Sequence, residues 1–173
     1  MRLTTISCLI TYIALLHFSS NAIFRAAAQD GYPAPNPVPL TQAIPLPYDQ
    51  ASFQRNGVEL TRYHYGPALD RPFLYPILGP SGRSLTRMGH PRDQESHSHH
   101  NSIWISHNDV NGVVFWGDQG KGKIRHKRIV EFEDGAREAY TVTENEWIDI
   151  ENDETLLREI RRNTVRLLDN SEW

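Results

Sequence analysis

The sequence predicts an all-β protein, folded as an antiparallel β-sandwich. Apolar and polar residues alternate with a period of two in several short segments, as they do in half-buried strands. Val58–Tyr65 and Ser102–Ser106 show this alternation, and turn-forming residues separate such segments at intervals typical of a sandwich. The alternation and the spacing of the turns together indicate the fold class.

Further strands are predicted along the rest of the chain. Successive side chains of a strand point to opposite sides, so the even-numbered residues from Ile124 to Phe132 are expected to share one face. Gly79–Gly82 and Glu133–Gly135 carry strong turn signals. The expected strands are Phe73–Leu78, Gly112–Gly117, Ile124–Phe132, Ala139–Val142 and Trp147–Ile150.

The stretch Thr155–Leu168 fits two kinds of secondary structure. Every fourth residue from Leu156 to Leu168 fits one face of a helix, whereas the alternation in the same stretch allows two paired strands. The turn between such strands would lie near Arg162-Asn163. The strand-rich surroundings favour the paired strands.

The N-terminus has the pattern of a secretory signal peptide. A positive charge at Arg2 precedes the apolar run Ile6–Phe18, and Ala26–Ala28 offers a small-residue cleavage site. The run is shorter than the roughly 20 apolar residues of a membrane span, although an uncleaved anchor is the alternative. We therefore expect residues 1–28 to be removed and the protein to be secreted or periplasmic. The remaining 145 residues contain no cysteine, so their own core must stabilise them.

Residues 29–48 are predicted to form a linker or an arm lying along the edge of the domain. Six of the eleven prolines fall between Asp30 and Tyr48, and proline-rich segments favour extended conformations with few backbone donors. The folded domain is accordingly expected to span residues 49–173.

The C-terminal sequence indicates that this domain is incomplete. The chain stops at Trp173 without a turn signal or a polar tail. If further strands normally follow, the sandwich would lack part of its cover. Trp147, Ile148, Leu167 and Leu168 are then expected to stay partly exposed.

The charge of the chain argues against some partners. Without the signal peptide, 16 basic and 21 acidic residues remain, which gives a net charge of −5. Nucleic acid and anionic membrane surfaces are therefore not expected partners. The local basic run Lys121–Arg128 alternates with apolar residues, as one solvated face of a strand does.

Four of the eight histidines, His97, His99, His100 and His107, lie within eleven positions. Alternate residues of a strand share a side, so His97 and His99 could converge on one divalent metal ion with His107. Alternatively, His99, His100 and His107 could act as acid or base groups at a metal-free substrate site, with Asp109 as the orienting carboxylate.

A structural role is the third interpretation, and the sequence does not decide between the three. In that case His97 and His99 would cap turns, while His107 and Asp109 would order the turn at Asn111-Gly112. Asn-Gly is the strongest two-residue hairpin signal. Calcium could bind through Asp109 and Asn111, but the segment lacks the spacing of a twelve-residue calcium loop.

Two tryptophans flank the histidines, one on each neighbouring predicted strand. Trp104 and Trp116 can be core anchors or surfaces on which a sugar stacks. With Asn111, they are the candidate substrate-binding residues.

Five segments carry distinctive motifs in one order: Arg71–Gly82, Leu85–Arg87, Ser96–Trp104, His107–Gly117 and Gly122–His126. Together they closely resemble the PmoA-like family of exported bacterial proteins, whose label is methane oxygenase PmoA. The resemblance runs from about Tyr48 to Trp173, and it implies a longer protein with a further β-rich half. Many members have Asp-His-Pro-His-His where this chain has Glu95-Ser-His-Ser-His-His100.

The resemblance implies a carbohydrate-related protein, similar in outline to mutarotase-like supersandwich folds. Literal methane oxygenation is not expected, because the membrane subunit of that enzyme is a helical bundle and this chain has one apolar segment. Two functions stay open: an exported enzyme acting on carbohydrate through His97–Asp109, and a non-catalytic glycan-binding or structural module. An enzyme needs several polar groups converging in one cleft, whereas a binding module would show an open aromatic face.

Overall fold

The computed structural model describes residues 35–89, 97–118 and 120–168. The predicted signal peptide and its cleavage site, residues 1–28, lie outside the described residues, as does most of the segment that precedes the compact unit beginning at Val38. The described residues contain no helix, and hence none that could span a bilayer.

Five antiparallel strands form the first sheet in sequence order, β1 to β5, each paired with the next. Asn56 and Gly57 join β2 to β3 with φ angles of 50° and 77°, the left-handed pair that a tight hairpin requires. The strands are β1 (Thr41–Leu46), β2 (Gln50–Arg55), β3 (Val58–His64), β4 (Phe73–Ile77) and β5 (Ile103–Trp104).

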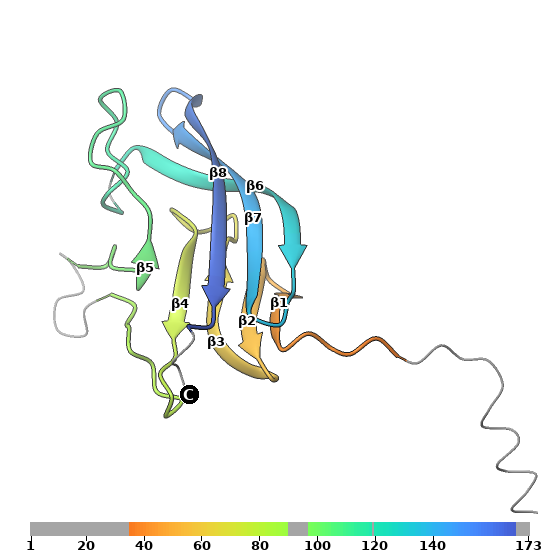
Figure 1. The fold of residues 1–173 in the computed structure, drawn as a ribbon. Helices are drawn as coiled ribbons and strands as arrows, with labels where there is room; N and C mark the ends of the chain where they lie inside the picture. The colour runs from red at the N-terminus through yellow and green to blue at the C-terminus, as the bar shows by residue number, and fades with distance from the viewer. Residues whose placement is uncertain (1–34, 90–96, 119, 169–173) are drawn as a thin grey trace, which may run out of the picture. The chain divides into compact units, whose positions relative to one another are not determined.

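Three longer antiparallel strands form the second sheet, with β7 in the centre. They are β6 (Gly122–Glu133), β7 (Glu138–Asp149) and β8 (Glu154–Arg166). In Figure 1 these cyan to blue strands cross in front of the orange to green strands β1–β4.

The two sheets share a core, which makes the fold a sandwich. Phe53 of β2, Tyr63 of β3 and Ala139 of β7 are almost completely buried and belong to one hydrophobic cluster. A pair of backbone hydrogen bonds, 2.9 and 3.0 Å long, also joins Thr41 in β1 to Gly135 in the β6–β7 turn. The predicted all-β sandwich class is therefore confirmed.

Polar side chains share the space between the sheets. The inward face of β7 carries Thr141, Thr143 and Asn145, all buried. Buried Arg161 of β8 donates to the Pro72 carbonyl oxygen at 3.3 Å and pairs with Glu159 at 2.5 Å. A guanidinium can be buried when its charge is paired and its N–H groups have acceptors, and both conditions are met here. Through its hydrogen bond to Pro72, Arg161 links β8 to the start of β4.

Several predicted elements are present where the periodicity placed them. The strands expected at Val58–Tyr65 and Phe73–Leu78 correspond to β3 and β4. The predicted turn after β4 is closed by a 2.9 Å hydrogen bond from the Gly82 N–H to the Gly79 carbonyl. The β6–β7 hairpin also turns where Glu133–Gly135 predicted it.

Other predicted boundaries were wrong, and long strands are the main reason. Ala139–Val142 and Trp147–Ile150 belong to the single strand β7, except that Ile150 lies just beyond its end. Thr155–Leu168 forms neither a helix nor two strands with a turn at Arg162, because β8 runs unbroken from Glu154 to Arg166. The inward face of β7 carries threonines and an asparagine, so the burial of this face does not show as an alternation of apolar residues in the sequence.

The loop regions also differ from the prediction. Gly112–Gly117 contains no strand, and only an isolated bridge joins Val110 to Val113. In β6 the expected common face of even-numbered residues is interrupted, because the pairing shifts after His126 and again after Ile129. Each shift moves the following side chains to the other face.

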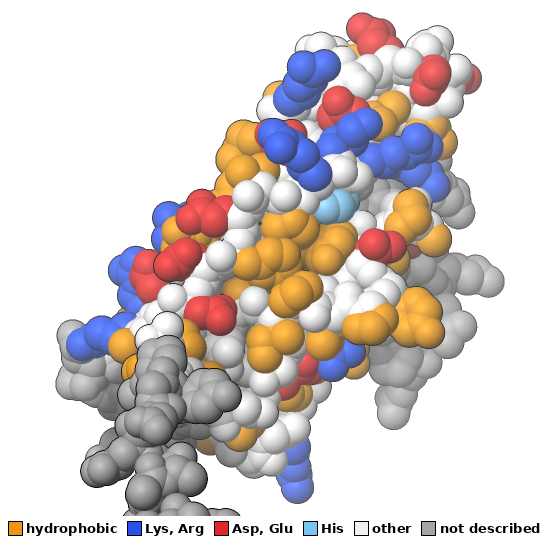
Figure 2. Space-filling model, turned by 90° about the vertical axis from the view of Figure 1, so that its right-hand side faces the viewer, with side chains coloured by type: hydrophobic (Ala, Val, Ile, Leu, Met, Phe, Trp, Pro, Cys, Tyr) orange, Lys and Arg blue, Asp and Glu red, His pale blue; other side chains and the backbone are white. Residues whose placement is uncertain are grey.

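Part of the proline-rich segment, which was predicted to be a linker or an arm along the edge of the domain, is a strand. Residues 41–46 form the edge strand β1, and the edge position suits Pro45, which has no N–H to donate. Trp147 and Ile148, expected to stay partly exposed, are buried, whereas Leu168 is exposed. Figure 2 shows one face of the molecule where hydrophobic side chains do reach the surface, with charged side chains around them.

Two half-buried histidines make the stability of this sandwich dependent on pH. The ring of His64 stacks on Phe73 at 4.9 Å, and the ring of His126 lies 4.5 Å from that of Tyr65. Burial lowers the pKa of both histidines below the ordinary value of 6.5, since removal from water disfavours the charged imidazolium.

We expect the fold to lose stability as the pH falls below 6.5. Below pH 6.5 the unfolded chain binds protons at His64 and His126 more readily than the folded chain does. The free energy of unfolding therefore decreases as the pH falls, until the lowered pKa values of the folded state are passed. Urea unfolding at a series of pH values checks this. The double variant His64→Gln/His126→Gln should show a shallower decline, and an equally steep decline would contradict the assignment.

Candidate functional site

The candidate site lies on the irregular segment between β4 and β6, which the short strand β5 ties to the first sheet. In β5, Ile103 pairs with Leu74 and Trp104 pairs with Phe73 of β4. Neighbouring residues of a strand point to opposite faces, so Ile103 and Trp104 lie on different sides of the sheet. Trp104 thereby faces the part of the segment that carries the histidines.

Three histidines and two tryptophans form one cluster on this side, here called the His–Trp cluster. The ring centroids of His97, His99 and His100 lie 4.5–6.4 Å from one another. Trp104 lies 5.7 Å from both His100 and Trp116, and His99 lies 6.0 Å from Trp116. Residues up to seventeen positions apart in the chain, His99 and Trp116, are thus brought into contact.

A buried arginine, Arg71, holds the two arms of this segment together. It is 1% exposed, and its guanidinium donates to the carbonyl oxygens of His99 at 3.2 Å and Gly117 at 3.1 Å. The same group reaches the side-chain oxygens of Asn101 at 3.5 Å and Asp118 at 3.2 Å. One side chain therefore positions both the histidine arm and the tryptophan arm of the cluster.

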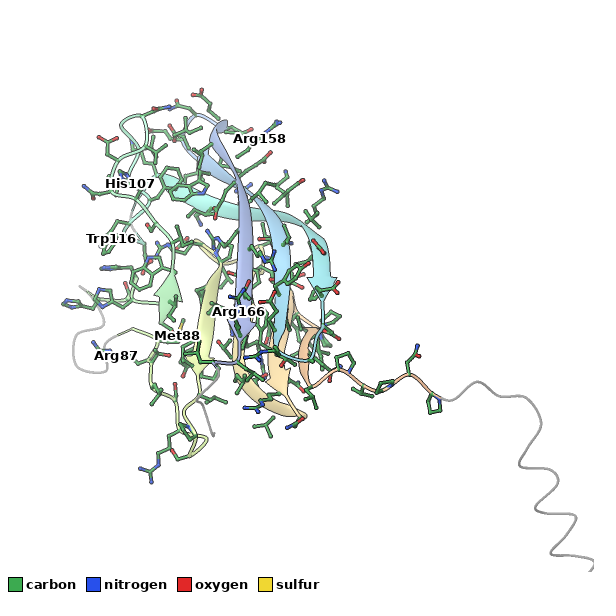
Figure 3. The ribbon with its side chains drawn as sticks, in the orientation of Figure 1. Arg87, Met88, His107, Trp116, Arg158 and Arg166 are labelled. Carbon is green, nitrogen blue, oxygen red and sulfur yellow. The ribbon has the colours of Figure 1, made fainter. Side chains whose placement is uncertain are left out.

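An open hollow of about 510 Å³ adjoins the cluster. Arg87 lies on the segment that follows β4, at the same edge of the molecule as Trp116, as Figure 3 shows. The lining residues are Ser84, Leu85, Thr86, Arg87, His100, Ser102 and Trp104.

Hydroxyl groups of the hollow are ordered by hydrogen bonds to one another. Thr86 Oγ1 accepts from the Ser102 hydroxyl at 2.7 Å and from the Ile77 N–H at 3.2 Å. The Ser84 hydroxyl donates to the Thr86 carbonyl at 2.6 Å. This small network fixes the segment after β4 against the segment before β5.

His107 and Asp109 form a separate local structure at a tight turn. His107 Nδ1 lies 2.7 Å from the Asp109 carbonyl oxygen and 3.1 Å from its backbone nitrogen, so either protonation state bonds to that backbone. The Asp109 carboxylate accepts from the Gly112 N–H at 2.6 Å. Asn111 and Gly112 have φ angles of 52° and 85°, as the predicted Asn-Gly turn requires.

The candidate metal ligands His97, His99 and His107 are not brought together as a set. Within the described part of the chain, the rings of His97 and His99 contact each other, the ring of His99 also contacts the two tryptophans, and neither ring contacts His107. His107 lies on the exposed turn. No group of three His, Cys, Asp or Glu side chains in residues 35–89, 97–118 and 120–168 could hold a metal ion. These residues therefore do not fit a divalent metal site.

The structure thus divides the predicted site residues into two sets. His97, His99, His100, Trp104 and Trp116 come together in the cluster, while the turn contains the other three, His107, Asp109 and Asn111.

Sequence reasoning missed the two arginines, Arg71 and Arg87. A single buried arginine such as Arg71 does not show in a hydrophobic pattern. Both arginines lie in segments that resemble the PmoA-like family, Arg71–Gly82 and Leu85–Arg87, but that resemblance assigned them no role.

Residues 50–173 match the family described as "Family of unknown function (DUF6807)". The chain belongs to this family. The match starts at Gln50, the first residue of β2, and includes Arg71, the cluster and the hollow. Comparisons with curated proteins and with solved structures find no match.

Proposed function

We propose that the protein is exported and binds carbohydrate at the His–Trp cluster and the adjoining hollow. One observation carries the proposal: two indoles and three imidazoles gather beside a hollow lined by hydroxyls and an arginine. Export rests on the signal-peptide pattern of residues 1–28. The resemblance to the PmoA-like family adds support for a carbohydrate-related role.

Sugars combine apolar C–H faces with many hydroxyl groups, so a sugar site needs a flat apolar surface beside polar side chains. Trp116 is 46% exposed, so part of its ring is available for a sugar to stack on. Trp104 brings its ring into the hollow, where Ser84, Thr86 and Ser102 offer hydroxyl groups. The arrangement provides stacking and hydrogen bonding in one place.

The position of the Asp109 carboxylate favours binding over catalysis. An acid/base mechanism would combine a histidine with an orienting carboxylate, and the predicted carboxylate, Asp109, accepts from the backbone of its own turn. Catalysis is the second candidate because His99 and His100 lie 4.5 Å apart by ring centroid. In that case His100→Ala would abolish turnover of a sugar that the variant still binds.

Substitution of the tryptophans tests the proposal. The purified exported protein is screened against an oligosaccharide array and titrated with the best ligands. We expect Trp104→Ala and Trp116→Ala each to weaken binding at least about tenfold, a loss of about 1.4 kcal/mol, because stacking surface is removed.

The matched control is Tyr48→Ala, which removes an aromatic side chain that is 90% exposed in the β1–β2 turn. This variant should bind like the unaltered protein, and melting curves show whether each variant is folded. Unchanged affinity in folded Trp104→Ala and Trp116→Ala, or no ligand on the array, would refute the proposal.

A further inference from the structure

We infer that the hollow selects sugars that carry a carboxylate, such as the uronic acid residues of acidic glycans. The inference rests on the proposed function and names its substrate class. Its first observation is the charge of the lining: among the described residues that line the hollow, Arg87 and His100 are ionisable and none is an acid. Because the whole chain has a net charge of −3, this positive site is a local feature.

The second observation is the direction of the hydrogen bonds in the hollow. A hydroxyl group has one proton and two lone pairs. Thr86 Oγ1 already accepts two hydrogen bonds, from Ser102 and from Ile77, so what it has left is its own proton to donate. The guanidinium of Arg87 is a donor only, so Thr86 and Arg87 both offer donors to a ligand in the hollow.

These donors suit a carboxylate, which when ionised is an acceptor only. Arg87 supplies the complementary charge, since a guanidinium can give two parallel hydrogen bonds to the two oxygens of one carboxylate. Among residues 35–89, 97–118 and 120–168 no carboxylate forms a salt bridge with Arg87. Ser84 and Ser102 have used their protons, so their lone pairs are left to accept from neutral sugar hydroxyls.

Calorimetric titration of the full exported chain tests this inference. The probes are trisaccharides of galacturonate, glucuronate and mannuronate, each beside its methyl ester and its neutral counterpart. We expect at least one acidic trisaccharide to bind at least about tenfold more tightly than both of its matched neutral forms. The preference should shrink as salt is added, because Arg87 is exposed.

Two arginine variants locate the preference. Arg87→Gln removes the charge in the hollow and should reduce the preference to within about threefold, whereas Arg83→Gln removes an exposed charge on the same segment, outside the lining, and should leave it intact. Equal losses in both variants would contradict the assignment to the hollow.

The remaining outcomes separate this inference from the proposed function. Neutral and acidic forms that bind equally well would overturn the inference and leave the carbohydrate site standing. Binding of succinate as tightly as the acidic sugar would also overturn it, since the site would then select a carboxylate alone. If no sugar of any kind binds, the proposed function falls together with the inference.

Discussion

Replacing Arg71 by methionine is expected to lower the free energy of unfolding by about 3 kcal/mol or more. Methionine fills a similar space but leaves the partly buried carbonyl groups of His99 and Gly117 without their donor. The Asp118 carboxylate is 29% exposed and can turn to water, so it adds less to the loss. Glycan binding should disappear as well, because the two arms of the His–Trp cluster lose their common anchor.

Urea unfolding followed by tryptophan fluorescence checks this result. The matched control is Arg83→Met, an exposed arginine for which a change within about 0.5 kcal/mol is expected. If Arg71→Met unfolds at the same urea concentration as the unaltered protein and still binds the glycan, Arg71 is not the anchor of the site.

Replacing Trp147 by alanine is expected to cost about 3–5 kcal/mol of stability. The indole is 5% exposed and packs on Phe115 with ring centroids 4.9 Å apart. Its N–H also donates to Glu159 at 2.7 Å, a carboxylate that Arg161 shares. The loss combines a large cavity with a weakened polar network, and it should loosen the segment that Phe115 fixes.

Two further tryptophan variants divide this effect. Trp147→Phe keeps most of the ring and removes the hydrogen bond, so a loss of about 1–2 kcal/mol is expected. Trp116→Ala removes the same side chain from an exposed position and should cost less than about 1 kcal/mol. A Trp147→Ala variant as stable as Trp116→Ala would show that the cluster of Trp147, Phe115 and Ile124 is not a core.

Two strands of the first sheet, β3 and β4, were predictable from the local sequence. Val58–Tyr65 alternates between apolar and polar residues, Phe73–Leu78 is a short apolar run followed by a turn signal, and both are strands. The second sheet was less predictable because β7 presents Thr141, Thr143 and Asn145 to the interior. When inward residues are polar, a pattern of hydrophobicity breaks one strand into two.

The site was predictable only where its residues are close in sequence. His97, His99 and His100 are neighbours in the chain, so their grouping could be anticipated, and the Asn111-Gly112 turn follows from residue preference. Arg71 reaches its partners across 28 to 47 positions. Contacts at that range depend on how the sheets place the segment, which periodicity does not reveal.

The central claim is that Trp104 and Trp116 form a carbohydrate-binding surface, and the indole N–H signals in nuclear magnetic resonance spectra test it most directly. Signals are assigned with single Trp→Phe variants, and an oligosaccharide chosen on the array is then titrated into the ¹⁵N-labelled protein. We predict that the signals of Trp104 and Trp116 shift together to saturation, while that of buried Trp147 stays in place. Saturable binding that leaves both signals unmoved would contradict the claim.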